Sequence, residues 1–161
     1  MSSDYQIGTR AMPVEVCLTN GSRLHGEVFL SLGAEGHSGG ETVADRMNDG
    51  RPFFPLRVTA PSPNVLLIGK AHVRYVIAPP EDDDDDRVTD TRGAASQVLV
   101  TAVMDSDEAF TGVFFVDLPP DRLRALDYIN GASLAFVPLA HLDREYLLNR
   151  AHILHFKDMS T

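Results

Sequence analysis

The sequence has one cysteine, no long apolar run and no excess of basic residues. A lone Cys17 cannot build an internal disulfide framework, and such scarcity is typical of the reducing cytoplasm. No apolar run approaches the roughly 18 residues of a membrane-spanning helix, and residues 1–10 lack the basic and apolar regions of a secretory signal. We therefore expect a soluble, cytoplasmic protein without a membrane span.

Motifs for catalysis are also missing. The chain contains no Gly-x-Ser-x-Gly elbow around a serine and no phosphate loop ending in Lys-Ser/Thr. No base lies next to Cys17 in the sequence to activate its thiol. The sequence therefore predicts a protein that is not an enzyme and that holds no cofactor.

The acidic residues are unevenly distributed. The net charge is −9, and more than half of it comes from the segment "EDDDDDRVTDTRGAAS" at residues 81–96. Five successive aspartates repel one another and bury no apolar surface, which favours a solvated linker over residues 80–96. A calcium site or a site for a basic partner is the alternative, but the segment lacks the spaced oxygen ligands and glycine of a calcium loop.

Two alternating segments, one on each side of this linker, predict β-hairpins. In "PVEVCLTNGSRLHGEVFL" the apolar residues recur at every second position, and Asn20-Gly21 favours a two-residue turn. "QVLVTAVMDSDEAFTGVFFV" follows the same plan around a polar turn. Gly26 and Gly112 occupy the same place in the second strand, where a glycine usually marks a bend or a close backbone approach.

A short helical segment and an aromatic strand follow each hairpin. The helical segments end in Asp-x-x-Asn, at Asp45–Asn48 and Asp127–Asn130, and each aromatic strand ends in Pro-Leu. Helical spacing of the apolar residues supports the first assignment, and Asp121 after two prolines is the expected start of the second helix. We expect the phenylalanines of the strand patterns to lie in the core: Phe53, Phe54, Phe114, Phe115 and Phe136.

The last strand of each copy begins with a basic residue, alanine and histidine. "KAHV" at residues 70–73 corresponds to "RAHI" at residues 150–153, an offset of 80 residues. Agreement at every element predicts a tandem duplication of a unit of about 65 residues. The predicted organisation is one unit at residues 12–79, the acidic linker, and a second unit at residues 97–157.

The repeated unit resembles the Sm-like family. "VEVCLTNGSRLHGEV" is similar to that family's first motif, and "LLIGKAHVRYV" is similar to its second. It also resembles a group of uncharacterised bacterial proteins with a duplicated Sm-like domain. The resemblance implies a mainly β fold with short helices, arranged as two tandem small Sm-like β-barrels from an internal duplication, and edge-to-edge association of such barrels.

The chain departs from the residues with which Sm-like proteins bind RNA. Gly69-Lys70 and Asn149-Arg150 stand where the family has Arg-Gly, and no basic stripe is present to neutralise phosphates. We therefore expect a non-enzymatic structural or protein-interaction module, an assembly subunit or adaptor that binds a protein partner or itself. The alternative is an RNA-binding Sm-like regulator.

The candidate interaction residues come from the repeated motifs: Asn48, Lys70, His72, Asn130, Arg150 and His152. His72 and His152 could share a metal, but two imidazoles without a nearby Cys or carboxylate make an incomplete site, so we assign no metal. Instead we expect both histidines at the rim, bonded to backbone or to the Asp-x-x-Asn turn of their own unit. By strand alternation, Ala71 and Ala151 should face a tight core.

Overall fold

The computed structural model describes residues 8–32, 40–60, 62–80, 96–116, 125–131 and 134–159, and these residues are mainly β. The strands are β1 Thr9–Leu18, β2 Arg23–Ser31, β3 Phe53–Val58, β4 Asn64–Gly69, β5 Val73–Ala78, β6 Ser96–Met104, β7 Ala109–Val116, β8 Phe136–His141, β9 Arg144–Asn149 and β10 Ile153–Asp158. The helices are α1 Val43–Asn48 and α3 Ala125–Gly131, and 3₁₀ turns cover Lys70–His72 and Arg150–His152. The predicted acidic linker lies outside the described residues except at its two ends.

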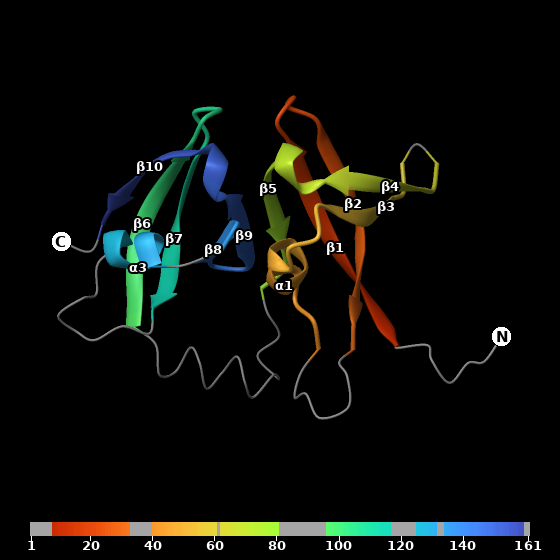
Figure 1. Ribbon diagram of the computed structural model, residues 1–161, viewed down its shortest axis with the longest axis horizontal. Coiled ribbons are helices and arrows are strands. Elements are labelled where there is room, and N and C mark those ends of the chain that lie inside the picture. Colours follow the sequence, from red (N-terminus) through yellow and green to blue (C-terminus); the bar gives the residue numbers. More distant parts are fainter. Residues whose placement is uncertain are drawn as a thin grey trace.

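The ten strands form one antiparallel sheet in the order β10-β6-β7-β8-β9-β5-β1-β2-β3-β4. The N-terminal half, β1 to β5, therefore has the internal order 5-1-2-3-4, and the C-terminal half, β6 to β10, has the same order. Figure 1 shows the halves side by side, with β5 and β9 between them and with β10 and β4 toward opposite ends. The two halves share one continuous sheet.

This sheet is open, whereas the sequence led us to expect two barrels. Closing a five-stranded unit on itself would require β5 to pair with β4 of the same half. Instead β5 pairs with β9, from the other half, so β4 and β10 are left as the edges of the sheet in the described chain. The mainly β class with short helices is confirmed, and the described strands do not form two closed barrels.

Both predicted hairpins are present, with one change in the turn. The Leu18 N–H donates to the Ser22 carbonyl at 2.9 Å, which leaves a three-residue loop instead of the predicted two-residue turn. Gly21 has a φ of 90°, while Asn20 is not in the left-handed region. The β6–β7 hairpin has Asp107 at a φ of 70°, a conformation that Asp enters more readily than most residues.

Gly26 and Gly112 lie where two backbones come close together, as predicted. A Cβ atom on Gly26 would lie 2.4 Å from the Arg57 carbonyl oxygen, and one on Gly112 would lie 2.5 Å from the Ala140 carbonyl oxygen. No side chain fits at such distances without a backbone shift. These glycines therefore allow β2 to approach β3, and β7 to approach β8.

Helix α1 is short and is held by its N-terminus. The Thr42 hydroxyl accepts a hydrogen bond from the Asp45 N–H, and the Asp45 carboxylate accepts one from the Thr42 N–H, both at 3.0 Å. This reciprocal capping box satisfies two helix-end donors, while Val43 and Met47 are buried. The predicted helix start at Asp121 lies outside the described residues.

Each of the two hydrophobic cores contains residues from both halves. The first core consists of N-terminal residues together with Phe136 and Leu147 from β8 and β9. The second consists of C-terminal residues together with Cys17 and Tyr75 from β1 and β5. Neither half therefore completes a core from its own residues. No helix in the described part of the chain is long and apolar enough to cross a membrane.

Candidate protein-interaction edges

The junction between the halves is a main-chain ladder. Strands β5 and β9 pair over four positions, from Tyr75 opposite Leu148 to Ala78 opposite Glu145. Backbone amides and carbonyls must be paired when they are buried, and this ladder pairs those of both strands. At this junction the last strand of the N-terminal half, β5, pairs with the fourth strand of the C-terminal half, β9.

An ion pair supports the hairpin end of this junction. Arg74 on β5 donates from Nε to the Asp105 carboxylate of the other half at 2.7 Å, and His152 Nδ1 lies 2.7 Å from the second oxygen of that carboxylate. The hydrogen bond with His152, followed by that from Arg74, holds the pKa of Asp105 below its ordinary value. At neutral pH the carboxylate is therefore ionised between these two groups.

Tyr75 adds a second polar contact across the junction. Its hydroxyl donates to the Glu108 carboxylate at 2.6 Å, and Arg23 reaches the same oxygen at 3.2 Å. Burial, followed by the hydrogen bond to Glu108, raises the pKa of Tyr75 well above its ordinary value. The phenol therefore remains protonated and serves as a donor.

Two asparagines bind the backbone of the opposite half. Asn48, at the end of α1, donates to the Phe136 carbonyl at 3.0 Å and accepts from the Phe136 N–H at 2.8 Å. Asn149, at the end of β9, donates to the Val73 carbonyl at 2.8 Å. Asn48 is thus a candidate residue that the structure places at an interface, although this interface lies within the chain.

The other two N-terminal candidates have different surroundings. Lys70 is only 8% exposed, and its ammonium donates to the Asp49 carboxylate at 2.7 Å and to the Arg46 carbonyl at 2.6 Å. Burial disfavours the ionised Asp49 carboxylate, but hydrogen bonds from Arg51 and Lys70 outweigh it and hold the pKa of Asp49 far below its ordinary value. Lys70 is therefore engaged internally, and His72 is exposed.

Each C-terminal candidate differs in exposure from its N-terminal counterpart. Asn130 lies in α3 and is exposed, and Arg150 is half-buried. His152 bonds to Asp105 in the β6–β7 turn, not to an Asp-x-x-Asn turn as we expected. Among the described residues, no group of three or more His, Cys, Asp or Glu could hold a metal ion.

The two alanines beside these histidines do not face a core. Ala71 and Ala151 are exposed, so the prediction that they pack tightly is wrong. Each lies in a 3₁₀ turn, at Lys70–His72 and Arg150–His152. Strand alternation, on which the prediction depended, does not apply to a helical turn.

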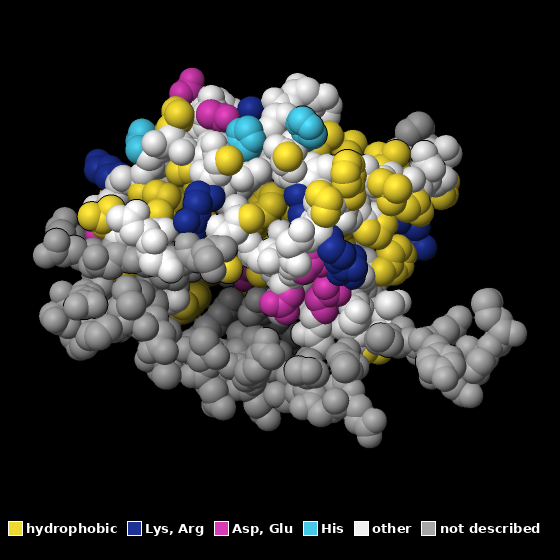
Figure 2. Space-filling view, in the orientation of Figure 1, with side chains coloured by type: hydrophobic (Ala, Val, Ile, Leu, Met, Phe, Trp, Pro, Cys, Tyr) yellow, Lys and Arg dark blue, Asp and Glu magenta, His cyan; other side chains and the backbone are white. Residues whose placement is uncertain are grey.

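An apolar surface marks the β4 edge. Phe53, Val65 and Leu67 expose 60%, 56% and 72% of their surface, and Figure 2 shows apolar side chains gathered at this end of the molecule. The prediction that Phe53 belongs to the core is therefore wrong, whereas Phe54, Phe114 and Phe136 are buried as predicted. Phe115 is half-buried.

The corresponding positions of the C-terminal half are buried. Aligning Pro55 with Pro138 makes Phe136 the counterpart of Phe53, and the offset of 80 residues makes Leu147 the counterpart of Leu67. Phe136 is 2% exposed and Leu147 is fully buried, because both pack into the N-terminal core. The same sequence position is covered in one half and uncovered in the other.

Strand β4 has few features that would prevent pairing. Its sequence, NVLLIG, contains no charge and no proline, whereas natural edge strands are usually protected by such residues. The run of four apolar residues was the available sequence signal, because such a run is typical of a strand that is covered on both faces.

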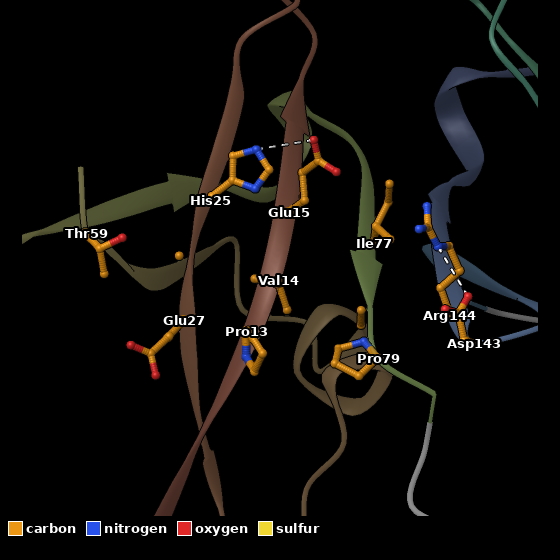
Figure 3. Close-up of a pocket in the computed structure, with 12 residues that line it drawn as sticks. Pro13, Val14, Glu15, His25, Glu27, Thr59, Ile77, Pro79, Asp143 and Arg144 are labelled. Atoms are coloured by element: carbon orange, nitrogen blue, oxygen red, sulfur yellow. Dashed lines mark ion pairs between the residues drawn. The ribbon is translucent and has the colours of Figure 1, made fainter. Parts of the chain in front are cut away.

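A groove of about 560 Å³ lies beside the junction, with walls from both halves. Figure 3 shows His25 and Glu15 on one side, with 3.6 Å between His25 Nε2 and the carboxylate, and Asp143 paired with Arg144 on the other. Among the described lining residues there is no serine or cysteine to serve as a nucleophile. The groove therefore presents charged groups from both halves.

Comparison of the chain with family models, with curated proteins and with solved structures gives no match.

Proposed function

We propose that the protein is a non-enzymatic interaction module, an assembly subunit or adaptor, that binds a protein strand along the β4 edge. The observation that carries this proposal is the exposure of Phe53 and Leu67, whose counterparts Phe136 and Leu147 are buried at the internal junction. The binding mode is strand addition, in which main-chain hydrogen bonds give affinity and side-chain pockets give specificity.

In this proposal each half is an Sm-like unit that resulted from duplication. The common strand order of the halves and the close approach at Gly26 and Gly112 support this reading. In a unit with this strand order, the last strand and the fourth strand are the two edge strands. The β5–β9 ladder joins one edge of each half. A cytoplasmic location, expected from the single cysteine, belongs to the same proposal.

A protein strand suits these edges better than RNA. The groups that the resemblance would assign to RNA are engaged inside the chain, with Asn48 on Phe136 and Lys70 on Asp49. Phosphate binding needs available cations, and the β4 edge offers apolar side chains instead. The uncovered surface therefore matches a strand with apolar residues.

The test is co-purification from native extract at physiological salt, using tagged wild type, Leu67→Asp and a control. Leu142→Asp is the matched control, because Leu142 is 90% exposed in the β8–β9 turn, away from both sheet edges. We expect wild type and the control to retain the same proteins and Leu67→Asp to lose them. Retention of the same proteins by Leu67→Asp, or loss of the bound material on ribonuclease treatment, would contradict the proposal.

A further inference from the structure

We infer that Asn20 is a modification site, at which the side chain reacts with the backbone and the asparagine becomes aspartate or isoaspartate. The inference does not depend on the proposed function, because it concerns the turn between β1 and β2 and not the β4 edge. Asn20 and Gly21 lie in the three-residue loop of this turn, and both are exposed to solvent. Water therefore reaches the two residues that take part in the reaction.

The reaction requires only this chain and water. The Gly21 nitrogen attacks the side-chain amide carbon of Asn20, and the new C–N bond closes a five-membered imide. The side-chain nitrogen leaves as ammonia and takes up the proton of the Gly21 N–H. Water then opens the ring. Hydrolysis at the side-chain carbonyl gives aspartate, whereas hydrolysis at the backbone carbonyl gives isoaspartate, in which the main chain runs through the former side chain.

Gly21 leaves its own nitrogen open to this reaction. No atom lies within 4 Å of the position that a Cβ atom on Gly21 would occupy. Its φ of 90° lies in the left-handed region, where most residues with a side chain are strained. The turn therefore favours glycine after Asn20, and glycine is the residue that hinders attack by the nitrogen least.

A backbone donor activates the amide carbon of Asn20. The Ser22 N–H donates to Asn20 Oδ1 at 2.9 Å, which turns the side-chain carbonyl toward the backbone that follows it. Attack places negative charge on this oxygen, and a donor already in position stabilises that charge. The Gly21 N–H donates to the Leu18 carbonyl at 3.0 Å. This bond has to open before attack, and such opening requires little free energy in an exposed loop.

A second Asn-Gly pair provides a comparison within the chain. Asn130 is followed by Gly131 and is also exposed, but both residues belong to helix α3. Closing the imide ring requires the ψ of the asparagine to rotate away from its helical value, and a hydrogen-bonded helix opposes that rotation. The same two residues should therefore react faster in the loop than in the helix.

Isoaspartate at position 20 would disturb a contact that supports the junction between the halves. Arg74 donates to the Thr19 carbonyl at 3.1 Å and to the Leu18 carbonyl at 3.4 Å. Its Nε donates to the Asp105 carboxylate of the C-terminal half at 2.7 Å. An isoaspartyl residue adds a methylene group to the main chain of the loop. The added length shifts the carbonyls that Arg74 holds, and the junction loses part of its support.

Incubation of the folded full-length chain at neutral and mildly alkaline pH, followed by peptide mapping with isoaspartyl methyltransferase labelling, tests the modification site. We expect Asn20 to react about fivefold faster than Asn130, because opening the helix adds roughly the free energy of one hydrogen bond to the barrier. Both rates should rise with pH, since the attacking nitrogen must lose its proton. In concentrated urea the two rates should become equal, because both Asn-Gly pairs are then unfolded.

Two variants of the same residue complete the test. Asn20→Gln should lose the labelled product in this loop, because its longer side chain would have to close a less favourable six-membered ring. Asn20→Asp has the charge of the product without the added methylene group, and we expect the isolated isoaspartyl form to unfold at a lower urea concentration than this variant. Equal unfolding midpoints would overturn the effect on the junction. Equal rates at Asn20 and Asn130 in the folded chain, or no product at Asn20, would overturn the modification site.

Discussion

Phe53 and Phe136 occupy the same place in the two halves, yet the first is 60% exposed and the second 2%. Their local sequences, Phe-Phe-Pro-Leu and Phe-Val-Pro-Leu, differ by one apolar residue. The difference in burial comes from the neighbouring strand, because β9 lies against β5 whereas β4 is a sheet edge. Similar sequence patterns therefore form similar strands in the two halves. The strand that lies next to each of them determines which side chains are buried.

The largest difference between the halves is expected when Leu147 and its counterpart Leu67 are each replaced by alanine. Leu147→Ala should cost about 2 to 5 kcal/mol in the free energy of unfolding, because a fully buried side chain leaves a cavity. Leu67→Ala should cost less than about 0.5 kcal/mol in the monomer, because its side chain is already exposed. Urea unfolding at low protein concentration measures both, and similar costs would mean that the β4 edge is covered within the chain.

The strand glycines should instead show the halves behaving alike. Gly26→Ala and Gly112→Ala should each cost about 1 to 3 kcal/mol, because the new Cβ atom would meet a backbone carbonyl at 2.4 or 2.5 Å. Gly131→Ala, where nothing lies within 4 Å, is the matched control and should leave stability unchanged or slightly raised. Thermal unfolding distinguishes these results, and a large cost in only one half would show that the close approach is not common to both.

Asn48 and Asn130, the last residues of the two Asp-x-x-Asn segments, should again differ in their effect on stability. Asn48→Ala should cost about 1 to 3 kcal/mol in the free energy of unfolding, because the Phe136 N–H and carbonyl lose their partner. Asn130→Ala should hardly change the stability of the monomer, since Asn130 is exposed. Urea unfolding of both variants is the measurement, and equal losses would contradict the different roles assigned to the two residues.

The smallest expected effect concerns acid stability, and it is a difference between the halves. Asp49 supplies a carboxylate in the N-terminal half, whereas its counterpart in the C-terminal half is Gly131. The pKa of Asp49 is lower in the folded chain than its ordinary value near 4, so its stabilisation is present above that value and is lost as the pH falls below it. Asp49→Asn should cost about 1 kcal/mol at neutral pH, and the difference from wild type should narrow below about pH 4. Unfolding free energies measured from pH 7 to pH 3 verify this, and a constant difference would argue against the Lys70 ion pair.

The sequence predicted the features that depend on neighbours along the chain. Alternation predicted the hairpins, and Gly26 and Gly112 predicted the close approach of two backbones. The same reasoning failed at Ala71, because one 3₁₀ turn interrupts the alternation. The spacing of apolar residues indicates which face of a helix or strand is buried, but only where that helix or strand is regular.

The sequence could not predict contacts between the halves. Leu147 is apolar in the sequence, but nothing along the chain indicates that it completes the core of the other half. The β5–β9 ladder joins residues about 70 positions apart, and such pairing depends on the whole fold. For the same reason Phe53 was assigned to the core, since its exposure reflects the position of β4 at the sheet edge in the described chain.

The exchange of core residues has a consequence for how the chain folds during synthesis. The N-terminal half leaves the ribosome first, but its core includes Phe136 and Leu147. The core of the N-terminal half therefore stays incomplete until β8 and β9 have been synthesised. Contacts between distant residues also slow folding, and we expect the finished protein to unfold in a single cooperative transition instead of one half at a time.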